Sequence, residues 1–390
     1  MNNDYQNWQG GFPNLKRCSR CIMPETWESI NFDENGVCNI CRNSEIKQKI
    51  DWQKKRQEFV ELITQYKGKG LYDCIVPYSG GKDSTFTLYS LVKDFGLKPL
   101  VVSFDHWYYR PKILANRVST QKILGVDCLT FRTDWQVVKK LMRESLERKG
   151  DFHWHAHTGC FALPMQMAVR FEVPLVIWGE PSSEYTAYYA YDDNEEIDER
   201  HFNRLVNLGI NAEDMVGMIK GVTMRDLEPY RYPSLKELKE IGCRSVCLGS
   251  YIPWDVRTQA QIIHDQIGWQ GDAVENIPPQ YWWEKVEDLF QGTDDYLKFI
   301  KRGLGRTCHL TSIDIRNGRM TREEAIELTK RYDGLRPASL DVFLDYLGMT
   351  EKEFNQIVLS HQVAPYQHDF SKTVRGPELW DQKLWDKTKC

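Results

Sequence analysis

The feature that most constrains this chain is a short loop with two glycines, Ser79–Ser84 (SGGKDS), which stands between an apolar run and a helical pattern. The run before it, Cys74–Val76, is typical of a buried strand. Two glycines let the backbone approach an anion, and a helix N-terminus offers unpaired N–H groups and the positive end of its dipole. The spacing differs from the G-x-x-x-x-G-K-[ST] loop of P-loop NTPases. The sequence therefore predicts a phosphate-binding loop of another kind.

Side chains of this loop supply further groups for an anion. The hydroxyls of Ser79, Ser84 and Thr85 can donate hydrogen bonds, and Lys82 carries a positive charge. A plain strand-to-helix turn that needs small residues is the alternative interpretation. Six fitting positions in a strand–turn–helix context favour phosphate binding.

Apolar runs and helical patterns alternate after the loop, at the repeat length of a parallel sheet with right-handed crossovers. The expected strands cover 100–104, 128–131, 175–178 and 246–252, and the expected helices cover 86–95, 113–124, 135–147 and 161–171. Ligands of such sheets bind beyond the carboxyl ends of strands, where residues 79–84, 104–106 and 133–134 all fall. The sequence therefore predicts an α/β fold with a doubly wound parallel sheet and one ligand crevice.

The fourth of these strand ends carries a carboxylate, in Gly179-Glu180. A carboxylate is both a hard oxygen ligand and a proton acceptor. We therefore expect Glu180 to hold Mg²⁺ or to orient the incoming nucleophile. A surface turn after a strand is the simpler alternative.

Four cysteines near the N-terminus have the spacing of a metal site. Cys18 and Cys21 form one C-x₂-C pair, and Cys38 and Cys41 form a second pair sixteen residues later. This pattern predicts a closed, structural four-thiolate zinc site, in a module with too few apolar residues to fold readily without metal. An iron–sulfur cluster is the alternative, because thiolates suit both, and reactive thiols are a weaker one.

Charge and hydropathy exclude several classes of protein. The chain has 51 Lys and Arg against 55 Asp and Glu, so no global field attracts a nucleic acid. No apolar run reaches the roughly 18 residues of a membrane span, and the polar start lacks the pattern of a signal peptide. Eleven cysteines in a large chain without an export signal suit reduced thiols rather than disulfides. We expect a soluble, cytoplasmic protein.

At 390 residues the chain exceeds the size at which a single core stops growing. We expect a zinc-binding module at 1–45, the sheet domain at 46–257 and a mostly helical region at 258–390. A helix is expected at 45–66, and the aromatic and acidic segment 185–240 is interpreted as an insertion that covers the site.

Three alternating histidines, His153, His155 and His157, precede Cys160. In an extended segment the three imidazoles would point to one side and could bind a cation together with Cys160. No carboxylate pattern accompanies them, so we favour the interpretation that they line the nucleotide or substrate pocket.

Cations and glycines alternate in the helical region, in Lys301, Arg302 and Arg306, and Arg316 follows in the next segment. Cations separated by glycines before a helix start can clamp phosphate or carboxylate groups. Solvated arginines in a turn are the alternative. Helices are also expected at 321–331, which opens with a capping box, and at 340–347 and 351–359.

Taken together, six segments resemble the N-acetyl sugar amidotransferase family, over about residues 15 to 360. They are Cys18–Cys41, Ser79–Ser84, Trp178–Glu180, Tyr251–Asp255, Gly303–Arg306 and Asp314–Arg316. The loop alone is similar to the PP-loop, S-G-G-x-D-S, of many ATP pyrophosphatases, and the combination is more specific. The resemblance implies the adenine nucleotide α-hydrolase fold.

The resemblance also implies an activity. Such enzymes convert an acetamido group of a nucleotide-activated diacetamido sugar, a precursor of bacterial O-antigen or of nonulosonic acids, into an acetamidino group, and they split ATP into AMP and pyrophosphate. The implied cofactors are ATP and Mg²⁺. The implied partner is a glutaminase that supplies ammonia, sometimes with a cyclase-like subunit, and a homo-oligomer is a further expectation.

Under this resemblance we assign roles to individual residues. The expected catalytic residues are Asp83, as a metal or water ligand, with Lys82 and Glu180. The expected ATP-binding residues are Ser79, Gly80, Gly81, Asp83, Ser84, Thr85, Phe104, Asp105 and Gly179. The expected ligands of the sugar nucleotide's anions are Lys301, Arg302, Arg306 and Arg316.

The alternative function is a PP-loop sulfurtransferase that acts on tRNA or on a small molecule. It shares the adenylylation step but needs a persulfide cysteine, for which Cys160 is the candidate. A zinc-ribbon adaptor that binds a nucleotide without turnover is a third interpretation, which the intact loop disfavours. The sequence leaves open which sugar reacts, and whether it is UDP- or CMP-linked.

Overall fold

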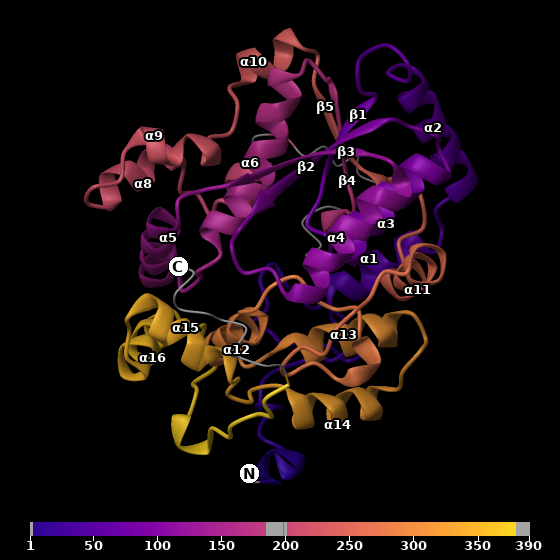
Figure 1. The fold of residues 1–390 in the computed structure, drawn as a ribbon. Coiled ribbons are helices and arrows are strands. Elements are labelled where there is room, and N and C mark those ends of the chain that lie inside the picture. The colour runs from indigo at the N-terminus through magenta and orange to yellow at the C-terminus, as the bar shows by residue number, and fades with distance from the viewer. Residues whose placement is uncertain (1–2, 185–197, 199–200, 380–390) are drawn as a thin grey trace.

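Five strands form a single parallel sheet in the order β3-β2-β1-β4-β5 (Figure 1). The computed structural model describes residues 3–184, 198 and 201–379. The strands are β1 (Cys74–Pro77), β2 (Pro99–Asp105), β3 (Asp127–Arg132), β4 (Leu175–Trp178) and β5 (Arg244–Cys247). The predicted α/β fold with a doubly wound parallel sheet is confirmed.

The strand order reverses at β1. The chain proceeds from β1 to β2 and β3 on one side and then returns to place β4 and β5 on the other. β1 pairs with β2 from Cys74↔Pro99 to Pro77↔Val102 and with β4 at Ile75↔Val176. Ligands of open α/β sheets bind at such a switch point, beyond the carboxyl ends of the strands. The loops after β1 and β4 therefore lie where a ligand is expected.

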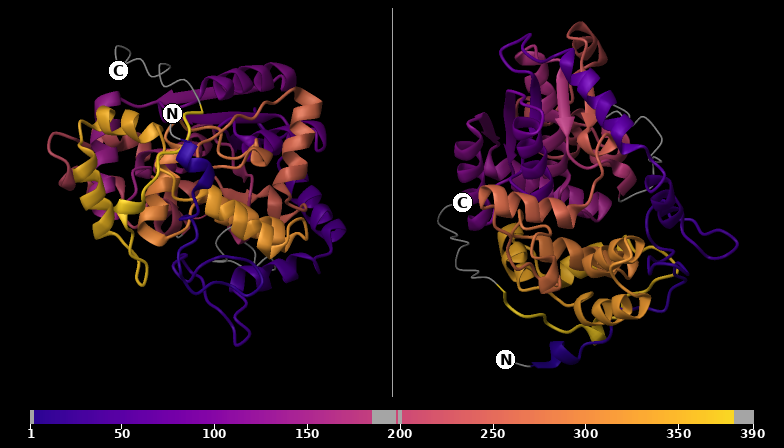
Figure 2. Two further views of the ribbon diagram at one scale, coloured as in Figure 1. Left: turned by 90° about the horizontal axis from the view of Figure 1, so that it is seen from below. Right: turned by 90° about the vertical axis from the view of Figure 1, so that its right-hand side faces the viewer.

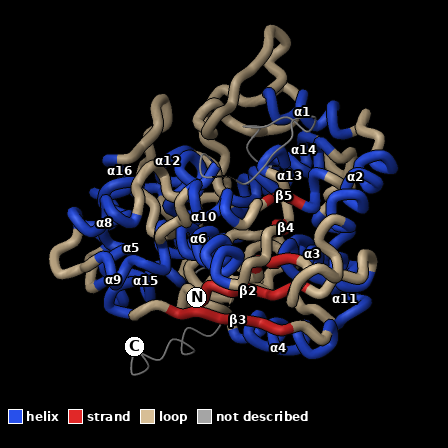
Figure 3. Tube along the Cα trace, turned by 90° about the horizontal axis from the view of Figure 1, so that it is seen from above, coloured by secondary structure: helices blue, strands red, loops and turns tan. Residues whose placement is uncertain are grey.

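Alternating strand residues serve two separate cores. Cys74 and Val76 pack with α2 (Trp52–Thr64), α3 (Lys82–Lys93), α4 (Pro111–Leu124) and α11 (Val256–Ile267). Ile75 and the alternate residues of β2 and β4 pack with α5 (Trp135–Lys149) and α6 (Trp154–Arg170). The sheet is thus covered on both faces, as Figure 3 shows, which explains why its central strands are continuous apolar runs.

Two predicted elements have different bounds in the structure. The expected helix at 45–66 is divided into α1 (Asn39–Lys47) and α2, because the Asp51 carboxylate accepts hydrogen bonds from Gln53 and Lys54 and caps a new helix. The last strand ends at Cys247 instead of Ile252, and a 3₁₀ turn follows it, where Gly249 packs against Trp254.

The helical region lies against the sheet domain on the side of the strand ends (Figures 1 and 2). Its helices are α12 (Gln291–Arg302), α13 (Arg306–Arg316), α14 (Arg322–Tyr332), α15 (Ser339–Leu347) and α16 (Glu351–Ser360). α12, α15 and α16 share an apolar core with α5. α14 begins after Thr321, whose capping box with Glu324 is present as expected.

Three short helices lie between β4 and β5, within the expected insertion. They are α8 (Ala212–Met218), α9 (Met224–Leu227) and α10 (Leu235–Glu240). Most of the segment before them, 185–197 and 199–200, lies outside the described residues, so its expected covering role stays a prediction. None of the described helices combines the length and the apolar character that a membrane crossing requires.

Candidate functional site

The loop Ser79–Ser84 connects β1 to α3 as predicted, and Gly81 is the N-cap of that helix, with no side-chain cap. The backbone N–H groups of the loop donate hydrogen bonds to the loop's own serine hydroxyls. The N–H groups of Ser79 and Gly80 donate to Ser84 Oγ at 3.3 and 3.2 Å, and the Gly81 N–H donates to Ser79 Oγ at 3.2 Å. The same groups can turn to phosphate oxygens, because a helix N-terminus without a side-chain cap retains free donors.

Charged side chains closely approach both glycines of the loop. Gly80 has a φ of 90°, and a Cβ there would lie 2.5 Å from the side chain of Arg117. A Cβ on Gly81 would lie 1.6 Å from the Glu287 carboxylate, which rests directly on the loop. A side chain at either position would thus displace a charged residue that packs on the phosphate loop.

A cavity of about 480 Å³ opens on one side of the loop. Ser79, Ser84 and the ends of β2 and β4 line it, with Phe104, Gly179 and Glu180 among the residues named in advance. Phe104 is buried, and its ring lies flat against Gly159 of α6 and edge-on to Tyr230 at 5.6 Å. The expected nucleotide residues Ser79, Ser84, Phe104 and Gly179 therefore meet around one cavity.

Two expected nucleotide residues have other surroundings. Asp105 is buried at the end of β2, where it forms an ion pair with Arg132 and accepts a hydrogen bond from the Trp107 N–H at 2.9 Å. Thr85 is fully buried in the first turn of α3. Neither residue is part of the wall of the 480 Å³ cavity.

A second cavity, of about 220 Å³, lies on the other side of the loop. Lys82, Asp83 and Glu180 form its sheet-domain wall. Its other wall comes from Trp27, Glu284, Lys285, Asp295, Lys298, Arg302, Leu304, Gly305, Arg306 and His309. Glu180 lines both cavities, so the two recesses meet at this carboxylate and the phosphate loop.

Buried ion pairs join the loop to the helical region. Lys82 Nζ lies 2.8 Å from Asp83 Oδ2 and 3.0 Å from Glu284 Oε2. Arg306 Nη1 lies 3.8 Å from Glu284 Oε1, and Arg306 Nε donates to Asp295 Oδ1 at 3.2 Å. Burial alone would raise the pKa of Glu284, but the charges of Lys82 and Arg306 outweigh it and lower that pKa to about 2.

The carboxylates of Asp83 and Glu180 both belong to residues that line the 220 Å³ cavity, and Glu180 also lines the 480 Å³ cavity. Desolvation, followed by repulsion from Asp83, raises the pKa of Glu180 to about 8. Asp83 Oδ1 is buried and has no hydrogen-bond partner within the described part of the chain. Two carboxylates that repel each other, one with an unused oxygen, suit a divalent cation with oxygen ligands.

The four cations expected to bind the sugar nucleotide divide into two groups. Arg302 and Arg306 line the 220 Å³ cavity, although both are in ion pairs, Arg302 with Glu28 and Arg306 with Asp295. Lys301 and Arg316 are outside the residues that line it. Lys301 Nζ donates instead to the Gly150 carbonyl at 2.8 Å, just after the end of α5.

The backbone N–H groups at the start of α13, after Gly305, already have a hydrogen-bond acceptor within the chain. The Asp333 carboxylate accepts hydrogen bonds from the N–H groups of Gly305, Thr307 and Cys308 at 2.8, 3.0 and 3.2 Å. The anion expected at this helix N-terminus is thus the side chain of Asp333, and the arginines bordering the glycines contribute to the cavity wall instead.

The three histidines do not form the extended, one-sided set that a cation site would need. α6 begins at Trp154, so His155 and His157 are helical and His153 is the N-cap. His153 Nε2 lies 2.8 Å from Asp288 Oδ2, while His157 lines the 480 Å³ cavity together with Cys160. Of the three histidines expected to line the pocket, His157 does so, whereas His153 and His155 are not among the residues that line this cavity.

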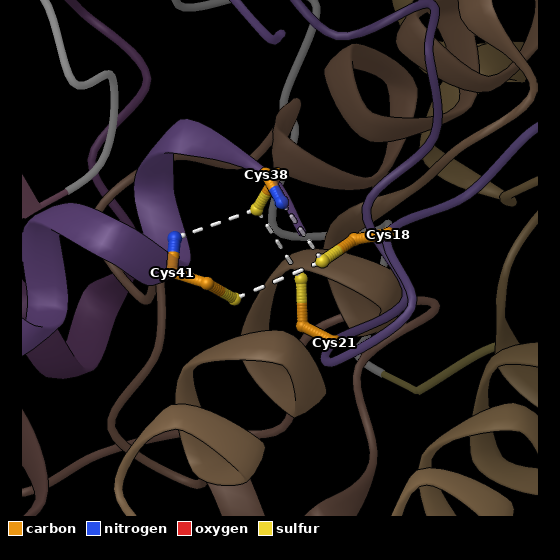
Figure 4. Close-up of side chains that lie close together, drawn as sticks. All are labelled: Cys18, Cys21, Cys38 and Cys41. Atoms are coloured by element: carbon orange, nitrogen blue, oxygen red, sulfur yellow. Dashed lines mark hydrogen bonds between the residues drawn. The ribbon is translucent and has the colours of Figure 1, made fainter. Parts of the chain in front are cut away.

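The four N-terminal cysteines converge as predicted (Figure 4). All four are buried, and their sulfurs lie within 4.8 Å of one another. Cys18 Sγ is 3.9 Å from Cys41 Sγ, and Cys21 Sγ is 3.8 Å from Cys38 Sγ. Among the described residues this is the only group of three or more His, Cys, Asp or Glu side chains close enough to share a metal ion.

The cysteine module is not isolated from the rest of the molecule. It shares an apolar core with Leu304 and Cys308 of the α12–α13 segment and Ala325 of α14. Arg322 donates to the Cys21 carbonyl at 3.3 Å. The module therefore supports the segment that forms the outer wall of the 220 Å³ cavity.

Sequence reasoning missed the acidic and basic residues that lead into α12. Glu284, Lys285 and Glu287 lie in a turn segment with no regular hydrophobic period, so nothing local distinguishes them from solvated charges. The one available signal is their density between the buried aromatic residue Trp283 and the buried residue Leu289.

Residues 280–384 match a protein family described as LPS biosynthesis protein WbpG-like, C-terminal domain. The match includes Glu284, Lys285, Lys298 and Arg306, and thus most of the outer wall of the 220 Å³ cavity.

A curated relative, the uncharacterized protein MJ1599 of Methanocaldococcus jannaschii, is 31% identical over 121 residues. These residues are 30% of this chain, and the chain spans 43% of the length of that relative.

Two solved structures are similar to the chain at low scores. NMN synthetase from Francisella tularensis has a TM-score of 0.35 at 12% identity, over 74% of this chain and 99% of that one. The U34-tRNA thiolase NcsA from Methanococcus maripaludis, solved with its 4Fe-4S cluster, has a TM-score of 0.29 at 12% identity, over 81% and 89% of the two chains.

Proposed function

We propose that this chain, whose residues 280–384 match the WbpG-like C-terminal domain family of LPS biosynthesis proteins, is an ATP-dependent sugar amidotransferase. Its substrate is a nucleotide-activated diacetamido sugar, and its product carries an acetamidino group. The observation that carries the proposal is the position of the phosphate loop between cavities of about 480 and 220 Å³ that meet at Glu180. One cavity suits the nucleotide, and the other suits the group that attacks it.

The first step activates the acetamido group. An amide carbonyl is a poor electrophile, and ammonia cannot displace its oxygen at neutral pH. The acetamido oxygen attacks the α-phosphorus of ATP, a new O–P bond forms, and the bond to pyrophosphate breaks. The amide nitrogen loses its proton as its double bond to carbon forms. The product is an imidate adenylate, whose leaving group is AMP.

The loop stabilises this step by holding the departing pyrophosphate. The N–H groups of Gly80 and Gly81 and the hydroxyls of Ser79 and Ser84 exchange their present bonds with one another for bonds to phosphate oxygens. Donors fixed at a helix start need little reorganisation when charge develops on the leaving group.

The second step introduces nitrogen. Ammonia attacks the imidate carbon, and AMP leaves with the electron pair of the C–O bond and with the former acetamido oxygen. The added nitrogen loses a proton, and the acetamidino group results. Ammonia is proposed to come from a partner glutaminase, in some cases with a cyclase-like subunit.

Asp83 and Glu180 are the residues that would hold Mg²⁺. Both are hard oxygen donors at the junction of the cavities, and the buried oxygen Asp83 Oδ1 has no partner in the described chain. When bound, the ion would neutralise charge that develops on the pyrophosphate oxygens.

Zinc is the metal that we assign to Cys18, Cys21, Cys38 and Cys41. A tetrahedral site with Zn–S bonds of about 2.3 Å places its sulfurs about 3.8 Å apart. The separations of 3.8 and 3.9 Å in the structure agree with one shared ion. An iron–sulfur cluster would hold the four sulfurs further apart, because a whole cluster fills the centre. The zinc would be structural, since no open position is left.

A sulfurtransferase remains the second candidate, because Cys160 lines the nucleotide cavity. Burial raises the pKa of Cys160 to about 12, although the nearby Arg117 opposes this. A persulfide carrier works as a thiolate, so this environment favours the amidotransferase.

The proposal is tested by pyrophosphate release with ATP, Mg²⁺, ammonium chloride and a panel of UDP- and CMP-linked diacetamido sugars. Release that depends on one sugar supports it, and the amidine product is then identified by mass spectrometry. Absence of release across the panel would overturn it.

A further inference from the structure

Five cationic side chains line the 220 Å³ cavity, and four of them are committed to carboxylates, which means that they form ion pairs with them. These four are Lys82 with Asp83 and Glu284, Lys298 with Asp294, Arg302 with Glu28, and Arg306 with Asp295. The fifth is Lys285, for which the described residues provide no ion pair. A committed cation must lose its partner before it can bind a ligand, whereas Lys285 is ready to bind an anion.

Lys285 is also held in an uncommon backbone conformation. Its φ is 49°, in the left-handed region that a lysine rarely adopts. The residues on either side fix this turn to the phosphate loop, because Glu284 pairs with Lys82 and the Glu287 carboxylate rests on Gly81. Strain of this kind persists where surrounding contacts over-determine the backbone, and it is frequent at ligand sites.

Lys285 lines the 220 Å³ cavity together with Glu180 and Glu284. Glu180 also lines the 480 Å³ cavity, so the lysine shares a wall with the residue at which the two cavities meet. The α-phosphate of ATP must lie at this junction, because it joins the nucleotide in one cavity to the acceptor in the other.

We propose that Lys285 binds the α-phosphate of ATP, so that the WbpG-like domain completes the nucleotide site of the sheet domain. The inference rests on the ATP site of the proposed function. The loop's own lysine, Lys82, is paired with two carboxylates, so the loop by itself lacks an uncommitted cation. An ammonium at the α-phosphate would neutralise the oxygens on which charge develops while the acceptor attacks.

The test is equilibrium binding of ATP, AMP and adenosine to the full chain, which needs neither a sugar nor ammonia. Lys285→Gln is compared with Lys285→Arg and with Lys352→Gln, which changes an exposed lysine of the same domain. We expect Lys285→Gln to weaken the binding of AMP and ATP roughly 10- to 100-fold, which is the effect of losing one hydrogen bond to a charged group. The affinity of Lys285→Gln for adenosine should stay within about twofold of the wild type. Lys285→Arg should bind AMP and ATP with most of the wild-type affinity, because an arginine also binds phosphate, and Lys352→Gln should bind all three ligands as the wild type does.

Three results would overturn the inference. AMP binding that Lys285→Gln leaves unchanged would remove Lys285 from the α-phosphate, even if ATP were weakened. Equal weakening of adenosine and AMP would assign the residue to the fold of the cavity rather than to phosphate. Wild-type protein that binds AMP no better than adenosine would contain no phosphate site. Failure of the proposed function has a different signature, namely normal ATP binding with no pyrophosphate release from any sugar.

Discussion

Lys82 Nζ, at the first residue of α3, lies 3.0 Å from Glu284 Oε2, in the segment that leads into α12. Both side chains are almost fully buried. This ion pair fixes the phosphate loop of the sheet domain against the helical region. The candidate site is therefore formed at the contact between two regions that are about 200 residues apart in the sequence.

Breaking this pair should destabilise the protein strongly. Lys82→Met removes the cation that Asp83 and Glu284 share and should cost about 3–5 kcal/mol, whereas Glu284→Gln leaves Lys82 paired with Asp83 and should cost less. The double variant should lose much less than the sum of the two, as measured by denaturant unfolding. Lys330→Met breaks the exposed pair with Glu327 and should cost less than about 1 kcal/mol. Additive losses for Lys82 and Glu284 would contradict the pairing.

The same pair should give the protein a characteristic acid sensitivity. The pKa of Glu284 is about 2 in the folded chain, below its ordinary value of 4.5. The carboxylate therefore contributes its full stability above about pH 4.5 and loses it as pH falls toward 2. The free energy of unfolding of the wild type, measured in urea, should decrease as pH falls through this range. The free energy of unfolding of Glu284→Gln should decrease less steeply. Parallel pH profiles for the two proteins would contradict this prediction.

Glycine replacement in the loop should separate packing from backbone strain. Gly81→Ala should weaken ATP binding, because its Cβ would lie 1.6 Å from the Glu287 carboxylate and would force that side chain to move. The Gly81→Ala, Glu287→Ala double variant should recover part of the stability. Gly68→Ala is the control, since that residue has a φ of 72° and open space around it, so it should lose about 1 kcal/mol and bind ATP normally. Normal binding by Gly81→Ala would contradict the close approach of Glu287.

Binding of Mg²⁺ should depend on pH through Glu180. Its pKa of about 8 in the metal-free protein means that the carboxyl is protonated at neutral pH. Mg²⁺ must displace this proton, so its apparent affinity in the presence of a non-hydrolysable ATP analogue should rise from pH 6 to pH 8 and then level off. Calorimetry in buffers of different ionisation enthalpy should detect the released proton. Glu180→Gln should remove the dependence, and a flat wild-type profile would exclude Glu180 as a ligand.

Metal analysis should distinguish the two interpretations of the cysteine cluster. Purified protein should contain one zinc per chain, and Cys38→Ser should lose it and unfold at lower denaturant, because the module supports α13 and α14. Cys243→Ser, outside the cluster, should retain it. Iron and acid-labile sulfide in place of zinc would contradict the assignment.

Replacement of Cys160 should separate the two candidate functions. Cys160→Ser should retain amidination, because the thiol only lines the cavity, whereas a sulfurtransferase should lose all sulfur transfer. Product analysis by mass spectrometry with ammonium or sulfide as the donor distinguishes them. A sulfur-containing product that disappears in Cys160→Ser would contradict the amidotransferase.

Local patterns in the sequence were sufficient to predict the residues of the candidate site that stand at the ends of strands. Ser79–Ser84, Phe104 and Gly179-Glu180 were predicted because each stands at or directly after the end of an apolar run, and parallel strands bring their ends together. The cysteine cluster was predicted from spacing alone, and its convergence is confirmed. In each case the functional side chains and the sequence pattern that predicts them lie within a few residues of each other.

The outer wall of the site depends on packing between distant segments, which no local pattern encodes. Lys301 and Arg306 are five residues apart and look alike in sequence, yet one caps the end of α5 and the other lines the cavity. Lys285 was missed because it lies in an irregular turn whose position is set by Glu284 and Glu287. The alternation of the histidines was misleading, because helix α6 begins at Trp154.

The most direct test of the central claim is pyrophosphate release by the purified protein with ATP, Mg²⁺, ammonium chloride and UDP- or CMP-linked diacetamido sugars. We predict release that requires one such sugar, one AMP for each acetamidino group formed, and loss of at least about 100-fold in Asp83→Asn. Sugar-independent release, or no release with any member of the panel, would contradict the claim.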